Sequence, residues 1–219
     1  LYFLHIVVLV YAAVPVTRAF LRRADEKTIR YALALWAFSG VLLPTARALG
    51  LLFWLDGIPV QWALSLTWSS IGCTALGWRL RKKPLRAGTS IALVLLGFAI
   101  CYVGTAVLSI RKGTLAPQLL EGLSPGPLMM AIGIFCLCEV LAPKLPNVLQ
   151  RTAETFGKSS FGIYLAHEFA LSAFRVFGVT TWFASPLISI PALAFACLLL
   201  TFMGVFVMSK IPIVRRWLI

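Results

Sequence analysis

The strongest constraint on this chain is a series of long apolar segments separated by short segments that carry most of the charge. Seven apolar segments are visible, and they cover residues 1–20, 29–47, 61–78, 88–110, 125–141, 159–178 and 185–209. Each is about 17 to 25 residues long, the length that a tilted α-helix needs to cross a bilayer. The sequence therefore predicts an all-α, polytopic integral membrane protein, a helical bundle with about seven transmembrane helices.

The composition indicates that lipid surrounds most of the chain. Hydrophobic residues make up 60% of the 219 residues, charged residues only 12%, and the mean hydropathy is +0.93. A soluble domain carries about 25% charged residues. The net charge of +13 would suit a nucleic-acid partner, but the charges lie in short clusters between apolar segments and not along one soluble face. We therefore expect the lipid bilayer as a partner, and no nucleic acid.

The basic residues are divided unequally between the two sides of the predicted bundle. Sixteen lie on one side: Arg18, Arg22, Arg23, Lys27, Arg30, Arg79, Arg81, Lys82, Lys83, Arg86, Lys144, Arg151, Lys158, Lys210, Arg215 and Arg216. Four lie on the other: Arg47, Arg111, Lys112 and Arg175. Because cytoplasmic loops are enriched in Lys and Arg, we predict a multi-pass protein of the bacterial inner (cytoplasmic) membrane with a cytoplasmic C-terminus.

The same charge pattern has a consequence for the organisation of the chain. It assigns the first residue to the outside, whereas bacterial inner-membrane proteins usually begin inside, so we expect an odd number of spans upstream. Neither a linker nor an internal repeat divides the sequence. We therefore interpret residues 1–219 as a single transmembrane domain that is truncated at its N-terminus.

The sixth apolar segment contains the richest group of polar residues. Ser160, Tyr164 and His167 follow the i, i+4, i+7 pattern of one helical face, and Glu168 lies beside that face. Polar residues at membrane depth indicate either function or helix–helix contact. The group is thus a candidate lining of a substrate cavity in which His167 exchanges a proton with a reactant, or alternatively a polar clamp between helices.

A basic cluster after the third segment, formed by Arg79, Arg81, Lys82 and Lys83, also has two interpretations. It sets the topology and attracts anionic lipid, or it binds a phosphorylated donor such as coenzyme A. We expect no metal, because nothing in the sequence has the spacing of a zinc pair. Cys136 and Cys138 are two residues apart and point away from each other on a helix.

Two parts of the chain resemble the membrane-bound acyltransferase family 3, a group of bacterial multi-span O-acyltransferases. Residues 156–167 read Phe-Gly-Lys-Ser-Ser-Phe-Gly-Ile-Tyr-Leu-Ala-His and are similar to the family's span Gly-Lys-x-Ser-x-Gly-Ile-Tyr-Leu-x-His. Residues 1–18 resemble another of its spans, with Tyr2 where the family usually has Trp. Residues 77–79, Gly-Trp-Arg, end a segment before a basic loop as in the family. In order and spacing the resemblance extends over almost the whole chain.

This resemblance implies a ten-span fold with both ends cytoplasmic, of which this chain holds the last seven spans and lacks three. It implies a transmembrane O-acyltransferase that moves an acyl group, often acetyl from acetyl-CoA, to a hydroxyl of a cell-envelope glycan, lipid or small molecule. Acetyl-CoA, or another acyl-CoA, is then a donor substrate arriving from the cytoplasm, and no cofactor is expected to stay bound. The family's reactive Arg and His belong to its first span, so we expect the 219 residues to be inactive alone and His167 to be the one catalytic candidate here.

A non-enzymatic membrane protein is the alternative hypothesis, either a transporter or an export partner for a polysaccharide intermediate. Transporters usually contain broken helices and inverted repeats. Neither pattern is evident in the sequence, which therefore favours the acyltransferase.

Overall fold

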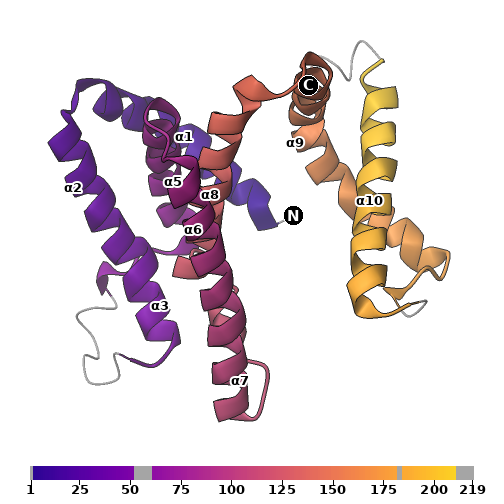
Figure 1. Cartoon of the computed structure of the whole chain (residues 1–219), viewed down its shortest axis with the longest axis horizontal. Helices are drawn as coiled ribbons and strands as arrows, with labels where there is room; N and C mark the ends of the chain where they lie inside the picture. Colours follow the sequence, from indigo (N-terminus) through magenta and orange to yellow (C-terminus); the bar gives the residue numbers. More distant parts are fainter. Residues whose placement is uncertain (1, 52–60, 182–183, 211–219) are drawn as a thin grey trace. The chain divides into compact units, whose positions relative to one another are not determined.

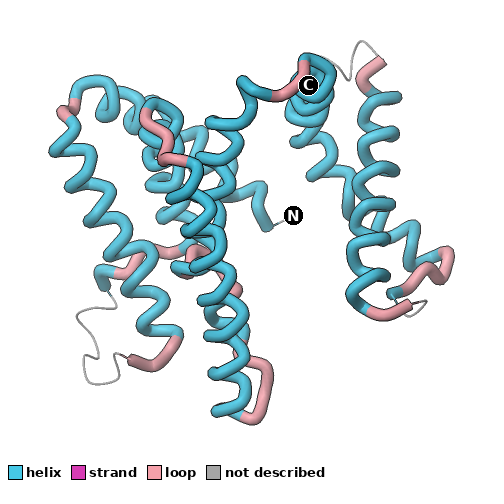
Figure 2. Tube along the Cα trace, in the orientation of Figure 1, coloured by secondary structure: helices cyan, strands magenta, loops and turns pink. Residues whose placement is uncertain are grey.

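The computed structural model describes residues 2–51, 61–181 and 184–210. These residues form helices and turns, and no strand occurs among them (Figure 2). The all-α prediction is therefore confirmed. The chain divides into two compact units, Leu1–Lys144 and Leu145–Ile219, which are described separately.

Unit 1 consists of helices and turns (Figure 1). In chain order they are α1 (Tyr2–Arg23), α2 (Glu26–Ala37), the π turn η1 (Phe38–Leu42), α3 (Leu43–Ala48), α5 (Leu66–Lys82), α6 (Ala87–Ala99), the π turn η2 (Ile100–Gly104), α7 (Thr105–Lys112), the 3-10 turn η3 (Pro117–Leu119), α8 (Pro125–Leu141) and the 3-10 turn η4 (Ala142–Lys144). Asp25 begins α2 as its N-cap, because its Oδ1 accepts a hydrogen bond of 3.1 Å from the Thr28 amide. Hydrogen bonding from Thr28, from its side chain first and its amide second, holds the pKa of Asp25 below its ordinary value.

Five helices in the described ranges are long and apolar enough to cross a membrane. They are Leu4–Arg23, Glu26–Ala48, Ala87–Lys112, Pro125–Lys144 and Pro186–Met208. Each coincides with one of the predicted segments, so the multi-pass membrane character is confirmed. The two other predicted spans, residues 61–78 and 159–178, are not confirmed, and neither is the predicted total of seven transmembrane helices. The helix α5 has only 17 residues and ends in basic side chains, and the sixth segment belongs to a longer helix with a charged first half.

Trp36 holds α2 against α5 in the interior of unit 1. Its indole Nε1 donates to the backbone oxygen of Ser69 at 2.7 Å and to the Ser69 Oγ at 2.9 Å. Ser69 Oγ in turn donates to the carbonyl of Gly40, in the π turn η1, at 3.2 Å. A Cβ on Gly72 would lie 2.2 Å from the Trp36 ring. The glycine therefore allows the indole to lie directly on the α5 backbone.

We expect Trp36→Phe to lower the free energy of unfolding of the protein in detergent by about 1–2 kcal/mol. Phenylalanine keeps most of the ring but loses the indole donor, which leaves Ser69 with unmet hydrogen-bonding capacity in a buried site. Thermal unfolding followed by circular dichroism measures the change. Trp68→Phe is the matched control, since the Trp68 side chain is 59% exposed. Equal shifts for the two variants would contradict the role given to the Trp36 bond.

Small residues bring α6 and α8 into close contact. A Cβ on Gly97 would lie 2.6 Å from the carbonyl oxygen of Gly126, and one on Gly133 would lie 2.5 Å from the carbonyl oxygen of Ser90. Cys136 is fully buried. Helices in lipid associate largely through such close backbone packing. This pair therefore forms the tightest helix contact of unit 1.

Unit 2 is a helical hairpin of α9 (Asn147–Val176) and α10 (Pro186–Met208), which lie side by side (Figure 1). The Phe156 and Phe202 rings stack with their centroids 4.2 Å apart. A Cβ on Gly162 would meet the Val205 side chain at 2.8 Å. The packed face of α9 is therefore built from small side chains.

Candidate functional site

The polar group predicted from the sixth segment lies in the second half of α9. The Tyr164 and His167 rings are neighbours, with centroids 5.4 Å apart and planes inclined by 37°. Glu168 follows, with its Oε1 3.8 Å from the His167 Nε2. Ser160 is exposed, and its hydroxyl donates to the Gly157 carbonyl one turn earlier at 2.8 Å. Tyr164, His167 and Glu168 are thus brought together, whereas the Ser160 hydroxyl is engaged within the helix.

The His167 ring contacts the backbone of its own helix. Its Nδ1 lies within hydrogen-bonding distance of the backbone oxygen of Tyr164. A carbonyl oxygen can only accept a hydrogen bond, so a bond at this position requires the tautomer that carries its proton on Nδ1 and keeps a lone pair on Nε2. The Glu168 carboxylate lies near that Nε2. The ring is therefore arranged to accept a proton at Nε2, next to a carboxylate that would stabilise the resulting imidazolium.

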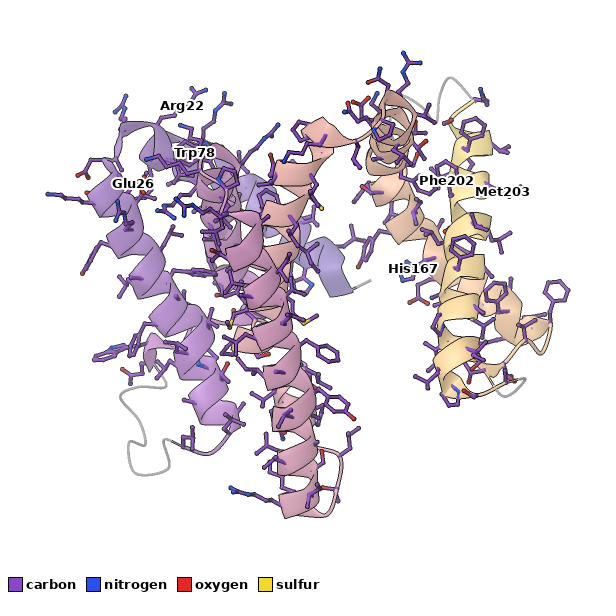
Figure 3. All side chains as sticks on the ribbon, in the orientation of Figure 1. Arg22, Glu26, Trp78, His167, Phe202 and Met203 are labelled. Atoms are coloured by element: carbon purple, nitrogen blue, oxygen red, sulfur yellow. The ribbon has the colours of Figure 1, made fainter. Side chains whose placement is uncertain are left out.

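The polar face of α9 is separate from the face that packs on α10. The buried residues of α9 are Ser159, Gly162 and Ala170, which the helix period puts beside the polar face rather than on it. The His167 side chain is 33% exposed and that of Glu168 is 53% exposed. His167 projects from α9 in Figure 3. The His167 and Glu168 side chains are thus partly exposed in unit 2.

The predicted basic cluster contains one residue with a structural partner. Arg79 donates to the Glu26 Oε1 from its Nη2 at 2.7 Å and from its Nε at 3.1 Å. Arg30 donates to the same oxygen at 3.2 Å. These bonds join the start of α2 to the end of α5. Arg79 is therefore engaged in holding the helices together.

The other three members of the cluster differ from Arg79 in being exposed. Arg81, Lys82 and Lys83 are exposed, and the Lys82 Nζ lies 3.8 Å from the centroid of the Trp78 ring. The cluster belongs to unit 1 and the His167 group to unit 2.

A pocket that sequence reasoning missed lies beside this cluster. It has a volume of about 320 Å³. Its walls come from α1 and α5 and consist of Val14, Thr17, Arg18, Leu21, Arg22, Thr74 and Trp78. Arg22, Trp78 and Glu26 are labelled at the same end of unit 1 in Figure 3. This pocket could not be predicted from the sequence, because α1 and α5 are about fifty residues apart and only their packing creates it.

The described residues do not form a candidate metal site. Across the described ranges, no three or more His, Cys, Asp and Glu side chains gather where they could hold a metal ion. The expectation that the protein binds no metal or cofactor stays a prediction.

Comparison with known proteins places the chain in a family. The acyltransferase domain of acyltransferase family 3 matches residues 1–209, which is nearly the entire sequence. No curated protein and no solved structure matches the chain significantly. The family match agrees with the resemblance of residues 156–167 and with the helical, multi-pass architecture. This chain belongs to acyltransferase family 3.

Proposed function

We propose that the protein is a transmembrane O-acyltransferase that transfers an acetyl group from acetyl-CoA to a hydroxyl of a cell-envelope glycan, lipid or small molecule. The observation that carries this proposal is the match of the acyltransferase domain over residues 1–209. We assign the protein to the bacterial inner membrane with its C-terminus in the cytoplasm, because sixteen of its 20 basic residues follow that orientation.

His167 is the proposed general base. In this reaction the acceptor oxygen attacks the thioester carbonyl and its proton passes to the His167 Nε2. The bond from carbon to sulfur then breaks, and the departing thiolate of coenzyme A takes that proton from the His167 imidazolium, which regenerates the base. The Nδ1–H bond to the Tyr164 carbonyl supports this role because it leaves the Nε2 lone pair available. Glu168, whose Oε1 is 3.8 Å away, would stabilise the imidazolium.

The remaining candidates have supporting roles. Tyr164 and Ser160 would line the substrate cavity next to His167. Arg81, Lys82 and Lys83 are proposed to attract the phosphates of the donor, since they are exposed and Arg79 already binds Glu26. Arg79 would act indirectly, by holding the end of α5 in place.

The direct test is an acyl-transfer assay on membranes that contain the full-length protein, with acetyl-CoA labelled in its acetyl group. We expect label to appear in an envelope glycan, a lipid or a small hydroxylated product. Absence of incorporation together with absence of acetyl-CoA binding would rule the proposal out. Movement of a glycan intermediate across vesicles without acylation would favour the transporter hypothesis.

Removal of two donor-site charges gives a more specific prediction. The double variant Arg81→Gln and Lys83→Gln is expected to raise the KM for acetyl-CoA by roughly tenfold or more, with little change in kcat. Each charge contributes about 1 kcal/mol to the attraction of an anion near the surface, and such uniform binding affects KM alone. Arg111→Gln with Lys112→Gln is the control, because these two residues have the same charge but lie on the opposite predicted side. Equal changes of KM in the two double variants would show that the loss of net charge, and not the loss of a donor site at Arg81 and Lys83, raises KM.

A further inference from the structure

Two pockets follow the same side of α1 and α5. The first is the pocket of about 320 Å³ that contains Arg18, Arg22 and Trp78. The second has a volume of about 560 Å³ and is lined by Ile6, Val7, Val10, Tyr11, Leu66, Ser70, Cys73, Thr74, Gly122 and Leu123. Thr74 belongs to both. The two pockets are therefore neighbours along one pair of helices.

The spacing of the lining residues indicates that the pockets form one continuous groove. On α1 they include Val7, Val10 and Tyr11 from the larger pocket and Val14, Arg18 and Arg22 from the smaller one. On α5 they include Leu66, Ser70, Thr74 and Trp78. Most of these residues follow one another at intervals of three or four, and the remaining lining residues of the two helices lie directly beside them, so they form a single stripe along each helix. We call this surface the α1–α5 groove.

The α1–α5 groove is apolar along most of its length and cationic at one end. The Ser70 hydroxyl donates to the Thr67 carbonyl, Thr74 donates to Ser70, and Thr17 donates to Ala13. These hydroxyl protons are engaged within their own helices, so the long part of the groove presents mainly hydrocarbon. It therefore suits an alkyl chain better than a chain that carries amides.

The other end of the groove is cationic. In the part of the chain that the structure describes, neither Arg18 nor Arg22 forms an ion pair, whereas Arg30 and Arg79 share Glu26. Trp78 lines the same end, and Trp is enriched where a membrane protein meets the lipid headgroups. Two arginines without a carboxylate partner therefore offer a site to an anion at the headgroup level.

We propose that the α1–α5 groove binds an anionic phospholipid, with its phosphate on Arg18 and Arg22 and one hydrocarbon chain along the apolar walls. The length is sufficient, because the fifteen residue steps from Val7 to Arg22 span about 22 Å at 1.5 Å per step. One leaflet of the hydrocarbon core is about 15 Å thick. Arg81, Lys82 and Lys83 do not line the groove, although Lys82 lies over Trp78 at its cationic end. The proposal does not depend on the acyl-transfer reaction.

Lipid titration monitored by native mass spectrometry tests the proposal on the protein in detergent. The probes are phosphatidylglycerol and phosphatidylcholine with identical chains. We expect phosphatidylglycerol to bind more tightly, and Arg18→Gln with Arg22→Gln to weaken it by roughly 25-fold, at about fivefold for each charge. The matched control is Arg23→Gln with Lys27→Gln, which removes the same charge from residues that do not line the pocket. This control should change the affinity less than threefold.

A second variant tests the apolar part without altering any charge. Val10→Trp would fill the groove between α1 and α5, and we expect it to weaken phosphatidylglycerol binding by at least tenfold. Unchanged binding in this variant, or equal losses in the two arginine and lysine pairs, would overturn the proposal. Displacement of phosphatidylglycerol by lower concentrations of palmitoyl-CoA would also overturn it, because the groove would then belong to an acyl donor.

Discussion

Replacement of His167 by glutamine is expected to lower kcat for acyl transfer by about 10²- to 10⁴-fold, the usual contribution of a general base. Glutamine preserves hydrogen-bonding capacity near the Tyr164 carbonyl but cannot take the proton of the acceptor hydroxyl. The KM for acetyl-CoA should change little, because His167 contacts the acceptor in the proposed reaction. Steady-state transfer of a labelled acetyl group in membrane vesicles measures both constants.

The chain provides its own control for this experiment, since it contains two histidines. His5 on α1 lies with its Nε2 3.2 Å from the Thr67 Oγ1. His5→Gln should retain kcat within about threefold, as no proton transfer is assigned to that ring. An intermediate loss of about tenfold is expected for Glu168→Gln, which keeps the shape but removes the charge next to the Nε2. If His167→Gln remained as active as His5→Gln, the general-base role would be wrong.

Gly97→Val is expected to destabilise the protein by about 3 kcal/mol or more, at the upper end of the cost of overpacking. The new Cβ would lie 2.6 Å from the Gly126 carbonyl oxygen and 3.0 Å from the Met130 amide nitrogen. Both are backbone atoms, so α6 and α8 would have to separate. In lipid, close packing of this kind is a main source of helix association. The loss should appear as a lower midpoint of thermal unfolding in detergent.

The same helix supplies the matched comparison. Gly88 lies nine residues before Gly97 on α6, and a Cβ there meets nothing within 4 Å. Gly88→Val should therefore leave stability unchanged or raise it slightly, since valine has a better helix propensity than glycine. Similar unfolding midpoints for Gly97→Val and Gly88→Val would contradict the close contact between α6 and α8.

The sequence predicts best those features of the structure that depend only on residues close together in the chain. The apolar segments predict five membrane-crossing helices well, because hydropathy and length depend only on neighbouring residues. The i, i+3 relation likewise puts Tyr164 and His167 side by side on α9. The third and sixth segments are different cases. Each combines apolar with charged or hydroxyl-bearing residues, and composition alone does not settle where such a helix begins or whether it crosses the bilayer.

The sequence by itself determined the helical membrane class, the family and the shared helical face of Ser160, Tyr164 and His167, because these follow from composition, periodicity and a contiguous motif. Only the tertiary structure decided the partners. In the folded protein Arg79 donates a hydrogen bond to Glu26, 53 residues away, whereas Arg81 and Lys83 are exposed. It also created the α1–α5 groove. Such contacts arise from the packing of helices distant in sequence, and side-chain spacing within one segment carries no information about them.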